Sequence, residues 1–249
     1  MKNIVLGVIL VIAVSCNKTI PSVIPPIVLT PTELPKIIYY GKTSYELKNT
    51  KNFINIDSLR TNLGIRNIGK YNGISNNGWV YVDMNNDGLE DIFYPYTSDG
   101  EFNSKPDVFI NKGKTYISDN SMLPSDYTGN QTTRKTIVGD FNNDSLPDLF
   151  LCNHGYESNN YWPGENNTLL LSDKKTGKYK LGTLPDIGKN FWHGGASGDL
   201  NKDGNIDIIV TAGNTIKVLY GSGDGSFNTT DWKYNGTSGY ITIEILAVN

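Results

Sequence analysis

The chain has 249 residues, of which 38% are hydrophobic and 19% are charged, a composition typical of a globular protein. This length suits one large all-β domain or two small ones. The formal net charge is only −3, so the charge balance indicates neither nucleic-acid binding nor electrostatic attachment to a membrane surface.

The first 15 residues are typical of a signal peptide. Lys2 starts a short positive region, and the apolar run 4–14 is too short to span a membrane as a stable anchor. The run ends in Ala13-Val14-Ser15-Cys16, which resembles the lipobox of bacterial lipoproteins, although leucine is more common at position 13. We therefore expect cleavage before Cys16, lipidation of its thiol, and anchoring in the bacterial cell envelope, at the outer membrane or cell surface. The alternative is an ordinary secretory signal with a chance cysteine.

Residues 16–37 are expected to form a proline-rich tether. Five prolines lie between residues 17 and 36, and they prevent a helix. An extended chain of this length would reach roughly 60 Å. Residues 38–78 follow as an N-terminal segment that can supply one or two strands.

Three acidic stretches recur in residues 79–249. They begin at Asp83, Asp140 and Asp199, which are 57 and 59 positions apart. Each follows a short apolar or small-residue run and precedes three more such runs, with a turn before the last. Four short strands in each repeat predict blades of a β-propeller. We expect an all-β, propeller-like array of four-stranded blades that is incomplete, with about three to four blades. The run 240–249 begins like the first strand of a fourth.

The repeated motifs also resemble a known family. The pattern D-x-N-x-D-G-x-x-D occupies residues 83–91 and 199–207, and "GDFN" and "GDLN" begin at Gly139 and Gly198. A glycine-bearing turn, "GDGSF", lies at 223–227. These features resemble the FG-GAP/VCBS repeat, which is the blade unit of integrin-α-type propellers and of many bacterial secreted proteins. The resemblance extends from residue 79 to about residue 240 and implies a propeller fold.

The spacing of oxygen-bearing side chains in these stretches predicts calcium sites. Ca²⁺ takes six to eight oxygen ligands, mostly from carboxylates, amides and backbone carbonyls. Positions 1, 3, 5 and 9 of each stretch would offer side-chain oxygens, and position 7 a backbone carbonyl. We predict up to three structural Ca²⁺ ions, with these ligands: Asp83, Asn85, Asp87, Leu89 and Asp91; Asp140, Asn142, Asp144, Leu146 and Asp148; Asp199, Asn201, Asp203, Asn205 and Asp207.

The stretches have two other interpretations. An EF-hand needs glutamate at position 12, where this chain has Tyr94, Leu151 and Val210. Plain polar turns would also favour Asp, Asn and Gly. However, carboxylates a few ångströms apart repel by several kcal/mol per pair at an effective dielectric constant near 20, which favours a neutralising cation. In the second stretch, Ser145 replaces the glycine and Pro147 stiffens the turn.

A ligand-binding face is expected opposite the acidic loops. In antiparallel blades, the loops from strand two to strand three and from one blade to the next share that side. Exposed aromatic and polar side chains there suit a glycan or protein ligand. Alternatively, the aromatic rings fill gaps between blades, and the histidines either form a site with Glu157 or Glu165 or are hydrogen-bonded loop residues. The candidates are His154, Tyr156, Tyr161, Trp162, Phe191, Trp192, His193, Trp232 and Tyr234.

These patterns predict a cell-surface, calcium-stabilised binding module for adhesion or for capture of an unidentified glycan or protein. No Ser/His/Asp order, phosphate loop or catalytic zinc motif is present in the sequence. The alternatives are a secreted polysaccharide lyase or hydrolase built on a propeller, and a structural part of a surface complex. Membrane contact is expected through the lipid anchor only, with no nucleic-acid partner. Cys152, in an apolar run, is expected to be a buried small hydrophobe.

Overall fold

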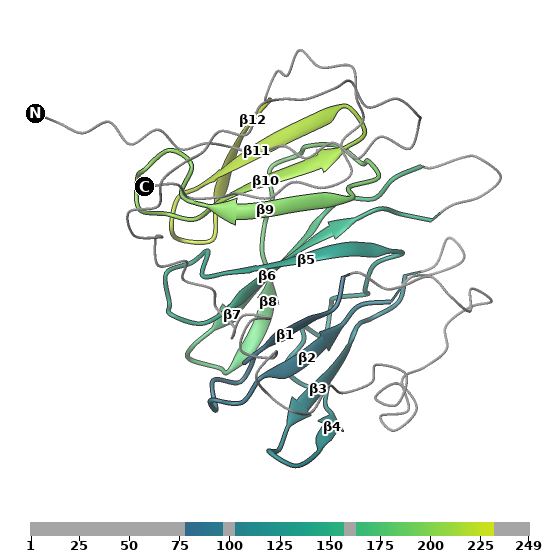
Figure 1. The fold of residues 1–249 in the computed structure, drawn as a ribbon, viewed down its shortest axis with the longest axis vertical. Helices are drawn as coiled ribbons and strands as arrows, with labels where there is room; N and C mark the ends of the chain where they lie inside the picture. The colour runs from purple at the N-terminus through teal and green to yellow at the C-terminus, as the bar shows by residue number, and fades with distance from the viewer. Residues whose placement is uncertain (1–77, 97–102, 157–162, 232–249) are drawn as a thin grey trace, which may run out of the picture.

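The structure, a computed structural model, describes residues 78–96, 103–156 and 163–231 (Figure 1). The expected signal peptide, Cys16, the tether, most of the 38–78 segment and the run 240–249 lie outside the described residues. In the part of the chain that is described, no helix is long and apolar enough to cross a membrane. The tethering and anchoring of the chain therefore stay predictions.

Twelve strands form three four-stranded antiparallel sheets in the described residues, so the all-β prediction is confirmed. The first sheet contains β1 (Val80–Val82), β2 (Asp91–Tyr94), β3 (Asp107–Asn111) and β4 (Tyr116–Ser118). The second contains β5 (Thr133–Gly139), β6 (Asp148–Asn153), β7 (Thr168–Asp173) and β8 (Lys178–Leu181). The third contains β9 (Gly194–Gly198), β10 (Asp207–Ala212), β11 (Thr215–Gly221) and β12 (Phe227–Asp231).

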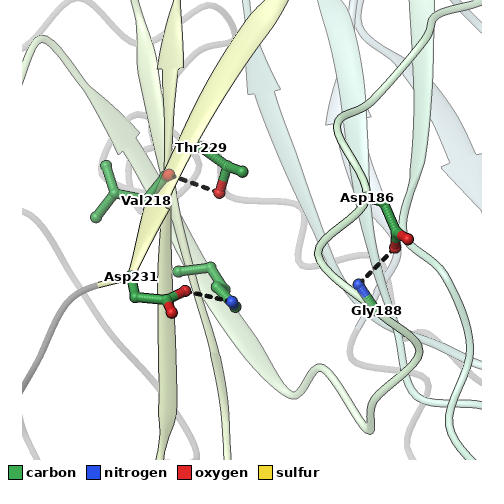
Figure 2. Close-up of polar contacts among 6 residues, drawn as sticks. Asp186, Gly188, Val218, Thr229 and Asp231 are labelled. Carbon is green, nitrogen blue, oxygen red and sulfur yellow. Dashed lines mark hydrogen bonds and ion pairs between the residues drawn. The ribbon is translucent and has the colours of Figure 1, made fainter.

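Each sheet is a simple meander in which strands follow one another in chain order. The second strands β2, β6 and β10 are buried along their whole length, as their β-branched and aromatic runs predict. The last strands β4, β8 and β12 are mostly exposed. In the third sheet, Thr229 donates to the carbonyl of Val218, and Lys217 forms an ion pair with Asp231 (Figure 2). Each sheet thus has buried inner strands and a largely exposed outer strand.

The sheets stack face to face, and the second sheet lies between the other two (Figure 1). One core joins the first and second sheets through side chains such as Phe93, Val108, Leu149 and Leu170. A second core joins the second and third sheets through Phe150, Leu169, Ile208 and others. Burial on both faces explains why the inner strands are almost entirely apolar. This arrangement is compatible with an incomplete propeller-like array of blades.

Candidate metal-binding loops and the opposite edge

The three acidic stretches form hairpin loops between the first and second strands of each sheet. In every loop the position-1 aspartate accepts hydrogen bonds from the backbone N–H groups of positions 5 and 6. The position-3 asparagine also accepts from position 5, and the position-5 aspartate accepts from position 7. All twelve donor–acceptor distances lie between 2.8 and 3.1 Å. The three loops therefore share one hydrogen-bonding scheme. Asp and Asn favour such turns because their side chains accept hydrogen bonds from nearby backbone N–H groups.

Two residues of each loop adopt positive φ angles. Position 4 does so at Asn86, Asn143 and Lys202, with φ of 58°, 56° and 63°. Position 6 is Gly88 (85°) in the first loop and Gly204 (88°) in the third. In the second loop Ser145 holds the same conformation at 68°, so the loop closes in the same way despite lacking glycine.

The aspartate at position 9 of each loop is fully buried at the start of the second strand. Its Oδ2 accepts the backbone N–H of loop position 2, and its Oδ1 accepts a backbone N–H from the end of the third strand. The donors are Met84 and Asn111 for Asp91, Phe141 and Ser172 for Asp148, and Leu200 and Gly221 for Asp207. Sequence reasoning treated these carboxylates only as ligands. The structure shows that each also joins the loop to the neighbouring hairpin.

Burial raises the pKa of all three position-9 carboxyls. The backbone donors oppose the rise, whereas neighbouring loop carboxylates add to it. The effect is largest at Asp148, whose pKa is raised to about 6. A negative charge at this position is therefore only partly compensated by the protein's own donors.

The oxygen set of each loop fits the chemistry of Ca²⁺. Carboxylate and amide oxygens gather within nine residues, and an oxygen that accepts one N–H keeps a second lone pair. The side chains are not a preformed cluster: among the described residues, no group of three or more His, Cys, Asp or Glu side chains could hold a metal ion as it stands. The position-9 carboxylates are instead directed to backbone donors.

The structure places the third-to-fourth-strand turns beside the acidic loops. In the second sheet the Ser172 hydroxyl donates to Asp148 at 2.7 Å. The N–H of Gly225, in the turn of the third sheet, donates to the carbonyl of Phe141 at 2.9 Å. Asn143 of the second loop donates to Asn205 of the third at 3.2 Å, so adjacent loops also contact each other.

At the opposite edge, the structure brings three ligand-face candidates together. The rings of His154 and His193 are 4.5 Å apart between centroids, and Phe191 lies about 6 Å from each. Tyr156 is partly buried. Tyr161, Trp162, Trp232 and Tyr234 lie outside the described residues.

Two of the candidates are not exposed, which corrects the expectation for them. Trp192 is 0% exposed and belongs to the core between the second and third sheets. His154 is 3% exposed. Trp192 therefore matches the alternative that aromatic rings fill the space between blades, whereas His154 is a buried loop residue whose N–H donates to the carbonyl of Thr132. Cys152 is fully buried in the same core, and burial raises its thiol pKa to about 12, so the prediction of a buried hydrophobe is confirmed.

Glu165 connects several backbone segments, and one of its donors is the N–H of Gly155, next to His154. Its carboxylate accepts the backbone N–H groups of Gln131 and Thr132 and the amide of Asn130. Burial is the main cause of its raised pKa. The carboxylate thus fastens the loop before β7 to the segment before β5. Glu157, the other proposed partner of the histidines, lies outside the described residues.

A comparison with models of protein families matches residues 140–210 to the FG-GAP-like repeat. The match runs from the first residue of the second acidic loop into β10 and includes the third loop. The resemblance inferred from the motifs is confirmed for these residues. The first loop lies outside the match but has the same hydrogen bonds. A search of curated proteins found no match.

Proposed function

We propose that this chain, an FG-GAP-like repeat protein, serves as a binding module at the bacterial cell surface. Its acidic loops hold structural Ca²⁺, and its opposite edge captures a glycan or protein. The observation that carries the proposal is the buried position-9 aspartate, which repeats in all three loops next to two further carboxylates. A divalent cation would compensate this charge.

The division into two edges supports separate roles for them. In the second sheet, Asp140, Asp144 and Asp173 lie at one end of the strands, where Lys174 of the turn donates to the carbonyl of Asp144 in the loop. At the other end, the connections 154–167 and 182–193 are long and contain mixed apolar and polar residues. Long loops on a rigid scaffold are typical places for binding. The lipobox-like sequence and the proline-rich segment support display from the envelope.

The proposal is tested by applying the purified protein to an array of bacterial and host glycans, and to extracellular-matrix proteins, in Ca²⁺ and in excess chelator. We expect retention on at least one ligand in Ca²⁺ and a clear loss of retention in chelator. A protein that binds nothing on either panel in Ca²⁺ would refute the binding role. Retention that is identical in chelator would refute the part assigned to Ca²⁺.

A further inference from the structure

A pocket of about 430 Å³ lies at the edge of the second sheet that is opposite the acidic loops. One wall is the start of β7, with Asn167 and Thr168, and the other is the end of β8 with the segment that leads toward the third sheet. β7 and β8 pair from Leu170 and Leu181 at this end to Asp173 and Lys178 at the acidic-loop end. The volume of the pocket is in the range of small-molecule sites.

The inner surface of the pocket is partly apolar. Leu169 is part of the core, and Leu184 and Ile187 pack against that core. Leu181, also in the lining, is 41% exposed and is one of the few large hydrophobic side chains at the surface of the described residues. A ligand that enters would remove apolar surface from water.

Asn167 and Thr168 are polar residues of the pocket lining, and each carries a donor hydrogen without an acceptor in the described residues. The Oδ1 of Asn167 accepts the backbone N–H of Asn153 at 3.0 Å, which fixes the orientation of the amide. Its Nδ2 is buried, and no described residue accepts from it. Thr168 Oγ1 accepts from Asn130 and Asn153, so the hydroxyl hydrogen must point elsewhere. The Asn167 Nδ2 is closed to solvent, so the Thr168 hydroxyl is the donor left for a ligand oxygen.

Asp186 adds a hydrogen-bond acceptor to the pocket lining. Asp186 lines the pocket, and its Oδ1 accepts the backbone N–H of Gly188 at 2.9 Å (Figure 2). This bond holds the exposed carboxylate in place. No donor among the described residues bonds its Oδ2 in the structure. Asp186 is also the single charged residue in the lining.

We infer that this pocket binds a neutral polyhydroxylated ligand, a sugar residue of a glycan. A hydroxyl can accept from Thr168 and donate to Asp186, while the C–H face of a sugar ring suits the leucine and isoleucine side chains. An anion would be repelled by Asp186. A metal cation would find a single carboxylate, and a purely apolar ligand would leave the Thr168 hydroxyl unpaired. This inference rests on the proposed binding role and assigns it a site.

The test is saturation-transfer NMR on the full chain with the methyl glycosides of glucose, galactose, mannose, fucose and N-acetylglucosamine. Leu181→Trp should block the pocket mouth, and Asp186→Asn keeps the acceptor for Gly188 while removing the charge. The matched control is Ile117→Trp, because Ile117 lies on β4, the equivalent outer strand of the first sheet, and is 46% exposed. Thermal melts establish that all variants are folded.

We expect at least one glycoside to bind wild type and Ile117→Trp equally, and to bind both pocket variants at least 10-fold more weakly. Absence of binding by all five glycosides to wild type would overturn the inference. Equal binding by wild type and Leu181→Trp would also overturn it, while leaving a binding role elsewhere on the chain intact. Failure on the larger glycan and protein panels is the separate result that refutes the binding role itself.

Discussion

Asp148 and Ser172 are joined by two hydrogen bonds, because the backbone N–H and the hydroxyl of Ser172 both donate to Oδ1 of Asp148 at 2.7 Å. The other carboxylate oxygen accepts the N–H of Phe141 at 2.7 Å. One buried carboxylate at the start of β6 therefore joins the acidic loop of the second sheet, through Phe141, to the end of β7, through Ser172. The equivalent aspartates make the same backbone contacts in the other two sheets.

Asp148→Ala is expected to lower the free energy of unfolding by about 3 kcal/mol or more, since it leaves several buried donors without an acceptor. Ser172→Ala is the matched control, because it removes the hydroxyl and keeps the backbone bond, and should lose only about 1 kcal/mol. Urea unfolding in the presence of chelator measures both values. Similar losses for the two variants would show that the carboxylate does not join the strands as described.

Ser145→Gly is expected to stabilise the protein by about 1 kcal/mol, because Ser145 is held at a φ of 68° where glycine has no steric penalty. Gly88 occupies the equivalent position of the first loop at 85°. The reciprocal change, Gly88→Ser, should therefore destabilise by a similar amount. Thermal and urea melts measure both effects. A Ser145→Gly protein no more stable than wild type would mean that the serine contributes a compensating interaction.

His193 predicts a loss of stability in mild acid. Burial, followed by the neighbouring His154 and Arg134, lowers its pKa from 6.5 to about 4. The unfolded chain therefore binds a proton at this histidine at a higher pH than the folded chain, so the contribution of His193 to stability is complete above pH 6.5 and falls as pH decreases toward 4. The loss is no more than about 3 kcal/mol and is reduced by partial exposure. His193→Gln should flatten the urea-derived stability profile between pH 7 and 4; an unchanged slope would contradict the assignment.

The strands could be predicted because each repeat places short apolar runs at fixed distances from an acidic loop. Each of the three repeats forms the four strands that the sequence predicts for it. The loop geometry followed from the same repetition, since Asp, Asn and Gly recur at the positions that need side-chain acceptors or positive φ. Local sequence carries this information because the hydrogen bonds from positions 5, 6 and 7 to positions 1, 3 and 5 lie within one loop.

The opposite edge could be predicted only in part, because burial there depends on how neighbouring sheets stack. Trp192 resembled an exposed loop aromatic in the sequence, but the contact between the second and third sheets encloses it. Trp192→Ala would thus remove core packing and cannot report on ligand binding. No sequence pattern distinguishes Asn167 and Asp186, because amides and carboxylates are common in loops. Only the folded arrangement of β7 and β8 shows them lining one pocket.

Removal of divalent ions is expected to lower the melting temperature of the wild-type protein, and added Ca²⁺ should restore it, because the proposed ions compensate carboxylates that are crowded in each loop. Asp87→Asn lowers the charge of the first loop and keeps an oxygen acceptor for the N–H of Leu89. Its stabilisation by saturating Ca²⁺ should therefore be smaller than that of wild type. Its melting temperature in chelator should be unchanged or higher, because repulsion between the carboxylates is reduced.

Asp119→Asn is the control, since Asp119 lies after β4, away from the acidic motifs. Melting temperatures that do not respond to Ca²⁺ in wild type would exclude structural calcium, and equal responses in wild type and Asp87→Asn would exclude the first loop as a site.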